Sequence, residues 1–313
     1  MMDIALDKPA QTFIQVAEVW APEGDRLVLS SGNYGELSDF AAVSGQQSFA
    51  RGDGLPGKAW AEARPVVLKG FEGSYFLRAE AAKAAGLTSA VAVPIFAGDV
   101  LKAVVVVICG DDENRVGAIE VWREDSNLLR LADGYYGAAK HFEWVSQHTQ
   151  FPRGQGLPGG VWAAKAPMLM RDLGSGYRFM RADAAGKAGL TTGLGLPVPA
   201  PSRAAYVLTL LSARGTPIAR RFEIWDARAA AVGKKHEAVL IDGICAREGR
   251  LWAEEGEAPR RATAWSGVIG RVLGSGLPVV EGRQPGIAAG YDNMVALPIH
   301  HEDEVAHIVA WYC

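Results

Sequence analysis

Hydrophobic and polar positions in the first hundred residues fall into short runs separated by turn residues. The runs Gln15–Trp20 and Arg26–Ser30 flank a segment rich in Pro, Gly and Asp, and this pattern predicts an antiparallel hairpin. Two longer apolar runs, Ala90–Phe96 and Leu101–Cys109, predict a second hairpin. Strand-sized apolar runs that are joined by tight turns are typical of an antiparallel sheet.

Two helices are expected between these hairpins. The first begins near Pro56, which suits a first helical turn, and it must end before Pro65. A strand is expected at Val66–Lys69. A second helix is predicted over Ser74–Ala85, which is rich in Ala, Glu and Lys, with Gly86 as its left-handed C-terminal cap. Sheet strands and helices in this order indicate an α+β unit in which helices flank a central antiparallel sheet.

The pattern is repeated along the chain. Glu18–Trp20 recurs as Glu120–Trp122 and as Glu223–Trp225, at offsets of 102 and 103 residues. Arg51–Gly57 recurs as Arg153–Gly159. A period near 102 residues is the size of a small domain and is too long for a solenoid repeat. Three tandem domains are therefore predicted, at residues 1–113, 114–217 and 218–313.

Composition narrows the class of protein. A net charge of −3 over 313 residues provides no electrostatic footprint for nucleic acid. The apolar runs are far shorter than a membrane span, and residues 1–8 contain no hydrophobic signal region. Three cysteines do not make a disulfide framework. We therefore expect a cytoplasmic protein without nucleic-acid or membrane partners.

The repeated motifs resemble those of the GAF domain family. The pattern Gly-x-Gly-Leu-Pro-Gly-x-x-Trp stands at Gly52–Trp60 and Gly154–Trp162, and each copy precedes an Arg-Ala-rich stretch that ends in Ala-Gly-Leu. The resemblance covers residues 15–215 well and 220–313 weakly. It implies a PAS-like fold, with a central antiparallel sheet and helices on both faces. Members of this family bind small molecules, bind chromophores or dimerise within signalling proteins.

The third unit departs from the family pattern. Gly267–Gly270 keeps the spaced glycines but lacks the Leu-Pro pair and the tryptophan. Twenty residues separate Pro278 from Pro298, against 29 between Pro65 and Pro94. The missing stretch corresponds to the helix that roofs the ligand cavity in this family. The resemblance therefore implies ligand cavities in the first two units and a structural or interface role for the third.

The candidate ligand-binding residues are aromatic and arginine side chains in the first two units. The two tryptophans either line a cavity or belong to the core. The two arginines either pair with an anionic ligand or lie on a solvated helix face, in local ion pairs with residues such as Glu72 or Glu80. The aromatic residues fit a mostly apolar site, although packing explains them equally well. The candidates are Trp60, Phe71, Tyr75, Arg78, Trp162, Tyr177, Phe179 and Arg181.

Other chemistry lacks a pattern in the sequence. The spaced glycines before Pro56 lack the long crossover helix of a dinucleotide-binding unit, so we interpret them as turn residues. No haem, bilin or nucleotide signature is visible, and the cofactor stays unknown. His300, His301 and His307 are interpreted as a polar hairpin tip, and no metal site is expected. Without a triad or an interpretable carboxylate pair, we expect a protein that is not an enzyme.

Two functions remain open from the sequence. The first is a cytoplasmic GAF-type sensor that binds a small molecule in domains 1 and 2 and, having no output domain of its own, signals to a partner in trans. The alternative is a non-enzymatic scaffold that dimerises through its GAF-like domains without a ligand. A thiol-based reductase would require an exposed Cys109 or Cys245 with a partner cysteine nearby. Cys109 and Cys313 stand at the position of Ser212 in the repeat, which indicates small packed residues.

Overall fold

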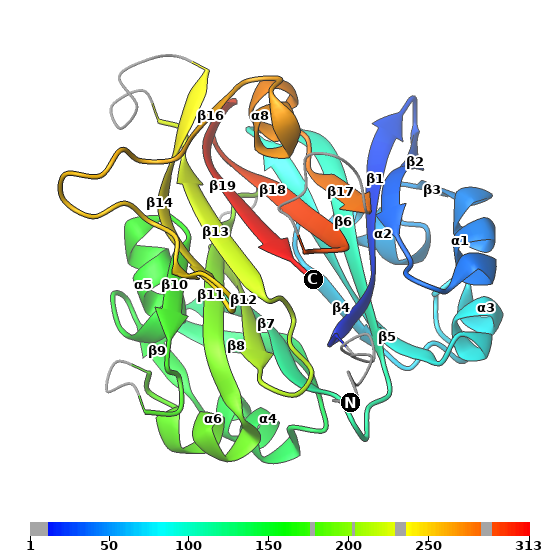
Figure 1. Cartoon of the computed structure of the whole chain (residues 1–313). Coiled ribbons are helices and arrows are strands. Elements are labelled where there is room, and N and C mark those ends of the chain that lie inside the picture. The colour runs from blue at the N-terminus through cyan, green and yellow to red at the C-terminus, as the bar shows by residue number, and fades with distance from the viewer. Residues whose placement is uncertain (1–11, 176–178, 202–203, 229–235, 283–289) are drawn as a thin grey trace, which may run out of the picture.

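The computed structural model describes residues 12–175, 179–201, 204–228, 236–282 and 290–313. Within these residues the strands form three sheets, one for each repeat, and every strand pairing is antiparallel. The α+β class expected from the sequence is therefore observed. Figure 1 shows the three sheets arranged around a common centre, with the helices on the outside.

The first sheet has the strand order β3-β2-β1-β6-β5-β4, so two hairpins meet at its middle. Its strands are β1 (Ile14–Glu23), β2 (Arg26–Asn33), β3 (Ser48–Ala50), β4 (Val66–Lys69), β5 (Leu87–Ala97) and β6 (Val100–Gly110). Its helices are α1 (Ser38–Gly45), α2 (Gly54–Glu62) and α3 (Ala79–Ala84).

The second sheet repeats this order as β9-β8-β7-β12-β11-β10. Glu120–Trp122 lies on β7, which pairs with β8 and β12 of its own unit. The strands are β7 (Val116–Asp125), β8 (Leu128–Gly137), β9 (Gln150–Pro152), β10 (Met168–Arg171), β11 (Leu190–Val198) and β12 (Tyr206–Ala213). The helices are α4 (Lys140–Gln147), α5 (Gly156–Ala164) and α6 (Ala182–Ala188).

The third sheet has the order β15-β14-β13-β19-β18-β17, and β16 also pairs with β14. The described part of this unit contains one helix, α8 (Gly267–Ser275). The strands are β13 (Arg221–Asp226), β14 (Glu237–Cys245), β15 (Gly249–Arg250), β16 (Arg261–Thr263), β17 (Val279–Gly282), β18 (Asn293–His301) and β19 (Glu304–Tyr312).

One helix is shorter than predicted. The segment before Ala79 forms a turn, because the Ser74 hydroxyl donates to the Phe71 carbonyl and accepts the Phe76 N–H. Such local hydrogen bonds compete with those of a helix, so α3 starts five residues later than expected. Gly86 follows α3 with a φ of +69°, which confirms its predicted left-handed conformation.

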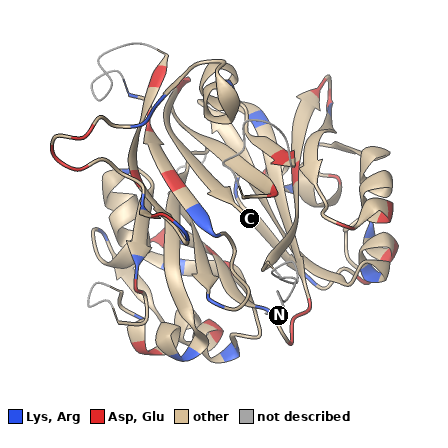
Figure 2. Cartoon of the chain, viewed as in Figure 1, with Lys and Arg blue, Asp and Glu red and all other residues tan. Residues whose placement is uncertain are grey.

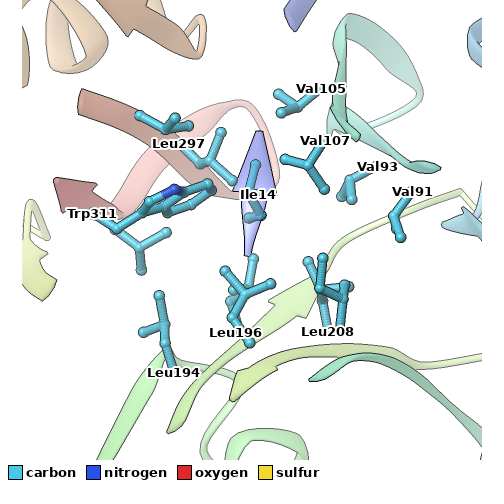
Figure 3. Close-up of a cluster of buried hydrophobic side chains, with 14 of the residues drawn as sticks. Ile14, Val91, Val93, Val105, Val107, Leu194, Leu196, Leu208, Leu297 and Trp311 are labelled. Atoms are coloured by element: carbon cyan, nitrogen blue, oxygen red, sulfur yellow. The ribbon is translucent and has the colours of Figure 1, made fainter. Parts of the chain in front are cut away.

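Each central strand is apolar on both faces. On β6, Ala103, Val105 and Val107 point to one side, whereas Val104 and Val106 point to the other, because successive strand residues face opposite ways. The second set packs under the helices of its own unit. The first set meets the corresponding residues of the other two sheets in a single buried cluster, which we call the hub. Figure 3 labels ten members of the hub: Ile14, Val91, Val93, Val105, Val107, Leu194, Leu196, Leu208, Leu297 and Trp311.

The sheets also contact one another in a cycle. In each contact, an edge strand of one sheet lies against the first hairpin of the next unit. Lys69 on β4 pairs with Asp133 on β8 at 3.1 Å, and Arg171 on β10 forms an ion pair with Asp242 on β14. From β17, the Val280 N–H reaches the Ser31 hydroxyl of β2 at 3.4 Å, so the third unit returns to the first. Many of the charged residues in Figure 2 lie on the outer helices, turns and strand ends.

Because the three sheets share the hub, we expect the three units to unfold together. Val105→Ala in the hub, where Val105 is 1% exposed, should lower the free energy of unfolding by about 1.5–3 kcal/mol through lost burial and a residual cavity. Urea denaturation should show one transition, shifted as a whole. Val100→Ala at a hairpin tip, where Val100 is 63% exposed, is the matched control and should change little. Two separate transitions, of which only one moves, would show independent domains instead.

Candidate functional site

A buried ion pair lies between the sheet and the helices of the first unit. Glu18 on β1 and Arg78, which directly precedes α3, are both buried, and both guanidinium ends contact the carboxylate. The second contact, from Nη2 to Oε2, measures 2.9 Å. Trp20 Nε1 and the Tyr34 hydroxyl also donate to this carboxylate, each at 3.0 Å. Ser44 on α1 accepts from Arg78 at 2.5 Å, so every charge here has several partners.

The second unit contains the same network. Arg181 forms a two-pronged ion pair with Glu120, and its Nη2–Oε2 distance is 3.0 Å. Trp122 Nε1 and the Tyr136 hydroxyl donate to the carboxylate at 3.1 Å, and Ser146 again contacts the arginine. Planar guanidinium groups suit such bidentate pairing with a carboxylate.

Aromatic rings enclose both guanidinium groups. The Arg78 guanidinium carbon lies 4.9–5.3 Å from the ring centres of Trp20, Phe40 and Phe76. Arg181 lies 4.6–5.4 Å from the rings of Trp122, Phe142, Phe151 and Phe179. These cation–π contacts exclude water and strengthen the electrostatic attraction within each pair.

The pKa of Glu120 reflects two opposed effects. Burial raises this pKa, because a carboxylate is poorly solvated inside the protein. The Arg181 charge and hydrogen bonds from Arg181, Thr209 and Ser146 outweigh burial, and the pKa ends below its ordinary value. A depressed pKa in the folded state stabilises the fold above the ordinary carboxyl pKa of about 4.3, and this stabilisation is lost as the pH falls.

The third unit keeps the carboxylate but obtains its arginine differently. Glu223 accepts from Trp225 Nε1 and from the Tyr312 hydroxyl, each at 2.9 Å. Its cation is Arg221, two residues earlier on the same strand, whose Nε donates at 2.7 Å. Arg221 stands where the first two units have Val16 and Ala118. The missing helix arginine is thus replaced from the strand itself.

The predicted roles of Arg78 and Arg181 need correction. Neither lies on a solvated helix face, and neither pairs with a local carboxylate such as Glu72 or Glu80; both are 3% exposed and pair with a glutamate about 60 residues away. Glu18 and Glu120 neutralise these two arginines in the structure. Pairing of the arginines with an anionic ligand is not tested and stays a prediction. The sequence contained a signal for one part of this network, the contact between the glutamate and the tryptophan, but none for the arginine. In Glu-x-Trp on a strand, both side chains share one face.

The aromatic candidates lie in different surroundings. Trp162 is buried and Trp60 is partly buried, and both adjoin the cores beneath their helices. Phe71 stacks on Phe76 with ring centres 4.0 Å apart, and Phe179 packs against Phe142. Tyr75 is 37% exposed, with Lys58 above its ring, and does not belong to the core. Tyr177 lies outside the described residues.

A cavity of about 850 Å³ lies between the second and third units. We call it the boundary cavity. It is bounded by the end of α5, by described residues between β11 and β12, and by the β18–β19 hairpin, and Trp162 is the predicted ligand-binding residue that lines it. Its lining includes Trp162, Lys165, Tyr206, Arg228, His301 and His307.

His307 is the unusual side chain of the boundary cavity. It is 3% exposed, and neither ring nitrogen has a hydrogen-bond partner among the described residues. Burial lowers its pKa and outweighs the opposite effect of Asp226, its cross-strand neighbour, so the imidazole is neutral near pH 7. A buried imidazole without partners is uncommon and calls for a reason.

The interpretation of the three histidines as a polar hairpin tip is wrong for two of them. His300 and His307 are buried, and only His301 is exposed, together with the turn residues that follow it. His300 and His301 do differ in exposure as their strand positions predicted. Burial also lowers the pKa of His300 to about 4, with a further contribution from Lys102.

The cysteines are unpaired. Cys109 and Cys245 are buried, and Cys313 is partly buried. Burial raises the pKa of both Cys109 and Cys313, which keeps these thiols protonated. Among the described residues, no group of three or more His, Cys, Asp and Glu side chains is placed to hold a metal ion. No helix in the described ranges has the length and apolar character needed to cross a bilayer.

Breaking the buried pair of the second unit should be strongly destabilising. Glu120→Gln leaves the Arg181 charge buried without a partner and should lower the free energy of unfolding at pH 7 by about 3–5 kcal/mol. It should also reduce the loss of stability between pH 7 and about pH 3, because the Glu120 contribution is lost as the pH falls below the ordinary carboxyl pKa of about 4.3. Urea denaturation at both pH values measures the two effects.

Two further variants test the cause. The double change Glu120→Gln with Arg181→Met should recover much of the stability at pH 7, because no charge is then buried. Glu72→Gln on the surface is the control, since its carboxylate is 87% exposed. Equal effects of Glu120→Gln and Glu72→Gln would contradict a structural role for the buried pair.

Comparison with known proteins finds a family match over the first part of the chain. Residues 1–122 match the family model of the GAF domain. No curated protein matches the chain. The solved structures that are similar to it include the following three. They are the A. aeolicus NLH2 GAF domain in an inactive state (21% identity, TM-score 0.26, 31% of this chain and 58% of that chain), the Neisseria meningitidis free methionine-R-sulfoxide reductase in complex with its substrate (20%, 0.24, 30% and 51%), and a Staphylococcus aureus NreA protein mutated in its nitrate binding site (18%, 0.26, 34% and 81%).

The chain spans only 58% and 51% of the first two of these structures. The family match covers the segment that carries the Gly-Leu-Pro-Gly motif, the first hairpin and the Glu18–Arg78 pair. Over residues 1–122, this chain is therefore similar to the GAF domain family.

Proposed function

We propose that this protein is a small-molecule sensor of the GAF type that binds its ligand in the boundary cavity. The observation that carries the proposal is His307, a buried neutral imidazole whose two nitrogens lack partners at the wall of that cavity. A neutral imidazole offers one donor and one acceptor. A bound ligand that supplies the complementary groups would remove the penalty of leaving them unsatisfied.

The cavity has the character of a ligand site. Its volume of about 850 Å³ lies within the usual range for small-molecule pockets. Trp162 and Tyr206 contribute aromatic surface. The wall carries both signs of charge, positive from Arg153, Lys165 and Arg228 and negative from Glu124, Glu302 and Glu304. This combination favours a compact polar molecule with an unsaturated or apolar part.

The interiors of the first two units support this location. In each unit the guanidinium group that was expected to meet a ligand is instead neutralised by a glutamate and enclosed by aromatic rings. A ligand there would have to displace a multiply bonded carboxylate. A ligand in the boundary cavity would not have to displace such an ion pair.

A ligand in the boundary cavity would touch two units at once. It would contact α5 of the second unit and the β18–β19 hairpin of the third, and so could bias their relative packing. We propose that this change reaches a signalling partner in trans and that the protein acts in the cytoplasm without catalysing a reaction.

A ligand-free scaffold is the second candidate. It is favoured by the filled interiors of the first two units, which resemble ordinary cores. Under this alternative, the protein would assemble with itself or with a partner, and the boundary cavity would have no specific occupant.

The proposal predicts opposite effects of one substitution on stability and on binding. His307→Leu removes unsatisfied polar atoms from a buried position and should raise the free energy of unfolding of the ligand-free protein by about 1–3 kcal/mol. The same change should abolish ligand binding. His141→Leu, at an exposed position on α4 outside the lining of the boundary cavity, is the control and should alter neither property.

Native mass spectrometry of the full chain, followed by denaturation, detects and identifies a co-purified small molecule. Thermal unfolding of the wild type and both variants in a panel of small metabolites measures binding. A stoichiometric ligand that His307→Leu loses and His141→Leu keeps supports the sensor. Strong destabilisation by His307→Leu, with no ligand in any measurement, favours the scaffold.

A further inference from the structure

Each boundary between units contains a groove of related construction. At the boundary of the first and second units, the residue after α2 faces the β7–β8 hairpin across a groove of about 500 Å³. At the boundary of the third and first units, the end of α8 faces β1 and β2 across about 270 Å³. The boundary cavity of the second and third units includes the end of α5 and the residues after β13. The three grooves therefore lie at corresponding boundaries of the repeat, although the residues that line them correspond only in part.

Three arginines gather in the first of these grooves, which we call the arginine groove. Arg64 follows α2, Arg123 lies on β7 and Arg130 lies on β8. Asp125 is the one carboxylate among the lining residues in the described chain, so the groove is positive. The protein as a whole has a net charge of −3, and this local excess is therefore not a general property of its surface.

The arrangement of the two strand arginines is unfavourable by itself. Arg123 and Arg130 stand directly opposite each other in the β7–β8 ladder. Like charges at such positions repel and destabilise a sheet. Arg130 is partly compensated by Asp125 at 3.3 Å, and Arg64 by Glu62. Arg123 forms no ion pair with any residue that the structure describes.

The other two boundaries show that the fold does not need these arginines. In the third–first groove, the positions of Arg64, Arg123 and Arg130 are occupied by Leu277, Ala21 and Val28. At the second–third boundary, the corresponding positions hold Ala166, Asp226 and Val239, which do not line the boundary cavity. Small, apolar or acidic residues thus stand at these positions elsewhere in the repeat. Three cations at one boundary have no structural reason in the repeat.

We propose that the arginine groove binds a compact oxyanion with two or more negative charges, such as a phosphate or polycarboxylate group. Guanidinium groups recognise these oxygens through paired charge-assisted hydrogen bonds. The anion relieves the repulsion between Arg123 and Arg130 and supplies the partner that Arg123 lacks. Tyr206, the cross-strand neighbour of Arg123 on β12, lines both this groove and the boundary cavity.

This site is separate from the ligand site proposed above. Its test uses inorganic pyrophosphate and citrate as probes, with the full chain in a buffer of low ionic strength. We expect at least one probe to raise the melting temperature by several degrees and to bind in calorimetry, more weakly as salt is added. Comparison of the two probes distinguishes a phosphate ligand from a polycarboxylate.

The variants copy residues that the chain itself uses at equivalent positions. Arg123→Ala introduces the residue that the first unit has at this position, Ala21. It should weaken probe binding at least tenfold and leave the melting temperature of the free protein unchanged or higher. Arg130→Val, which introduces the residue found at the equivalent position Val28, should have the same effects on binding and on the melting temperature. Arg51→Ala removes an exposed arginine before α2 and should leave binding unchanged.

Three results would overturn the proposal. The first is that neither pyrophosphate nor citrate binds at millimolar concentration. The second is an equal loss of binding in Arg51→Ala, which would indicate attraction to charge in general. The third is undiminished binding in Arg123→Ala. None of these depends on His307, so the outcome is independent of the sensor proposed for the boundary cavity.

Discussion

The burial of both faces of every central strand is the constraint on which this structure depends. A sheet with helices on one side leaves its other side apolar, and an apolar face must be covered. Here three such faces cover one another in the hub, and the edge strands follow the same cycle from unit to unit. The hub explains why the third unit retains its sheet although the described part of it has one helix.

The second constraint is the carboxylate on the first strand of each unit. Glu18, Glu120 and Glu223 are buried, and a buried carboxylate requires a cation and hydrogen bonds. The first two units take the arginine from the segment before a helix, and the third takes Arg221 from the strand itself. The same physical requirement is thus met in two ways within one chain.

These two constraints direct attention to the boundaries between units. The hub and the ion pairs occupy the interiors, whereas the grooves at the boundaries differ from one another. One contains the unsatisfied His307 and another contains Arg123 opposite Arg130. Because equivalent positions elsewhere hold ordinary residues, these departures identify the places where the chain carries more than its fold requires.

The sequence by itself determined the repeat, the two hairpins of the first unit, the antiparallel α+β class and the glycine cap at Gly86. These depend on turn residues and on periodicity within a few positions, which are local properties. It did not locate the start of α3, because the Ser74 turn competes with the helix.

Only the tertiary structure decided which residues meet. Arg78 and Glu18 are 60 residues apart, and no local rule connects them. The continuous apolar character of β5 and β6 is what burial on both faces requires, yet it does not identify the other two sheets as the cover. The residues that surround His307 and Arg123 likewise come from other strands and from other units. Contacts between distant segments depend on how whole sheets pack, and a pattern read along the chain does not contain that information.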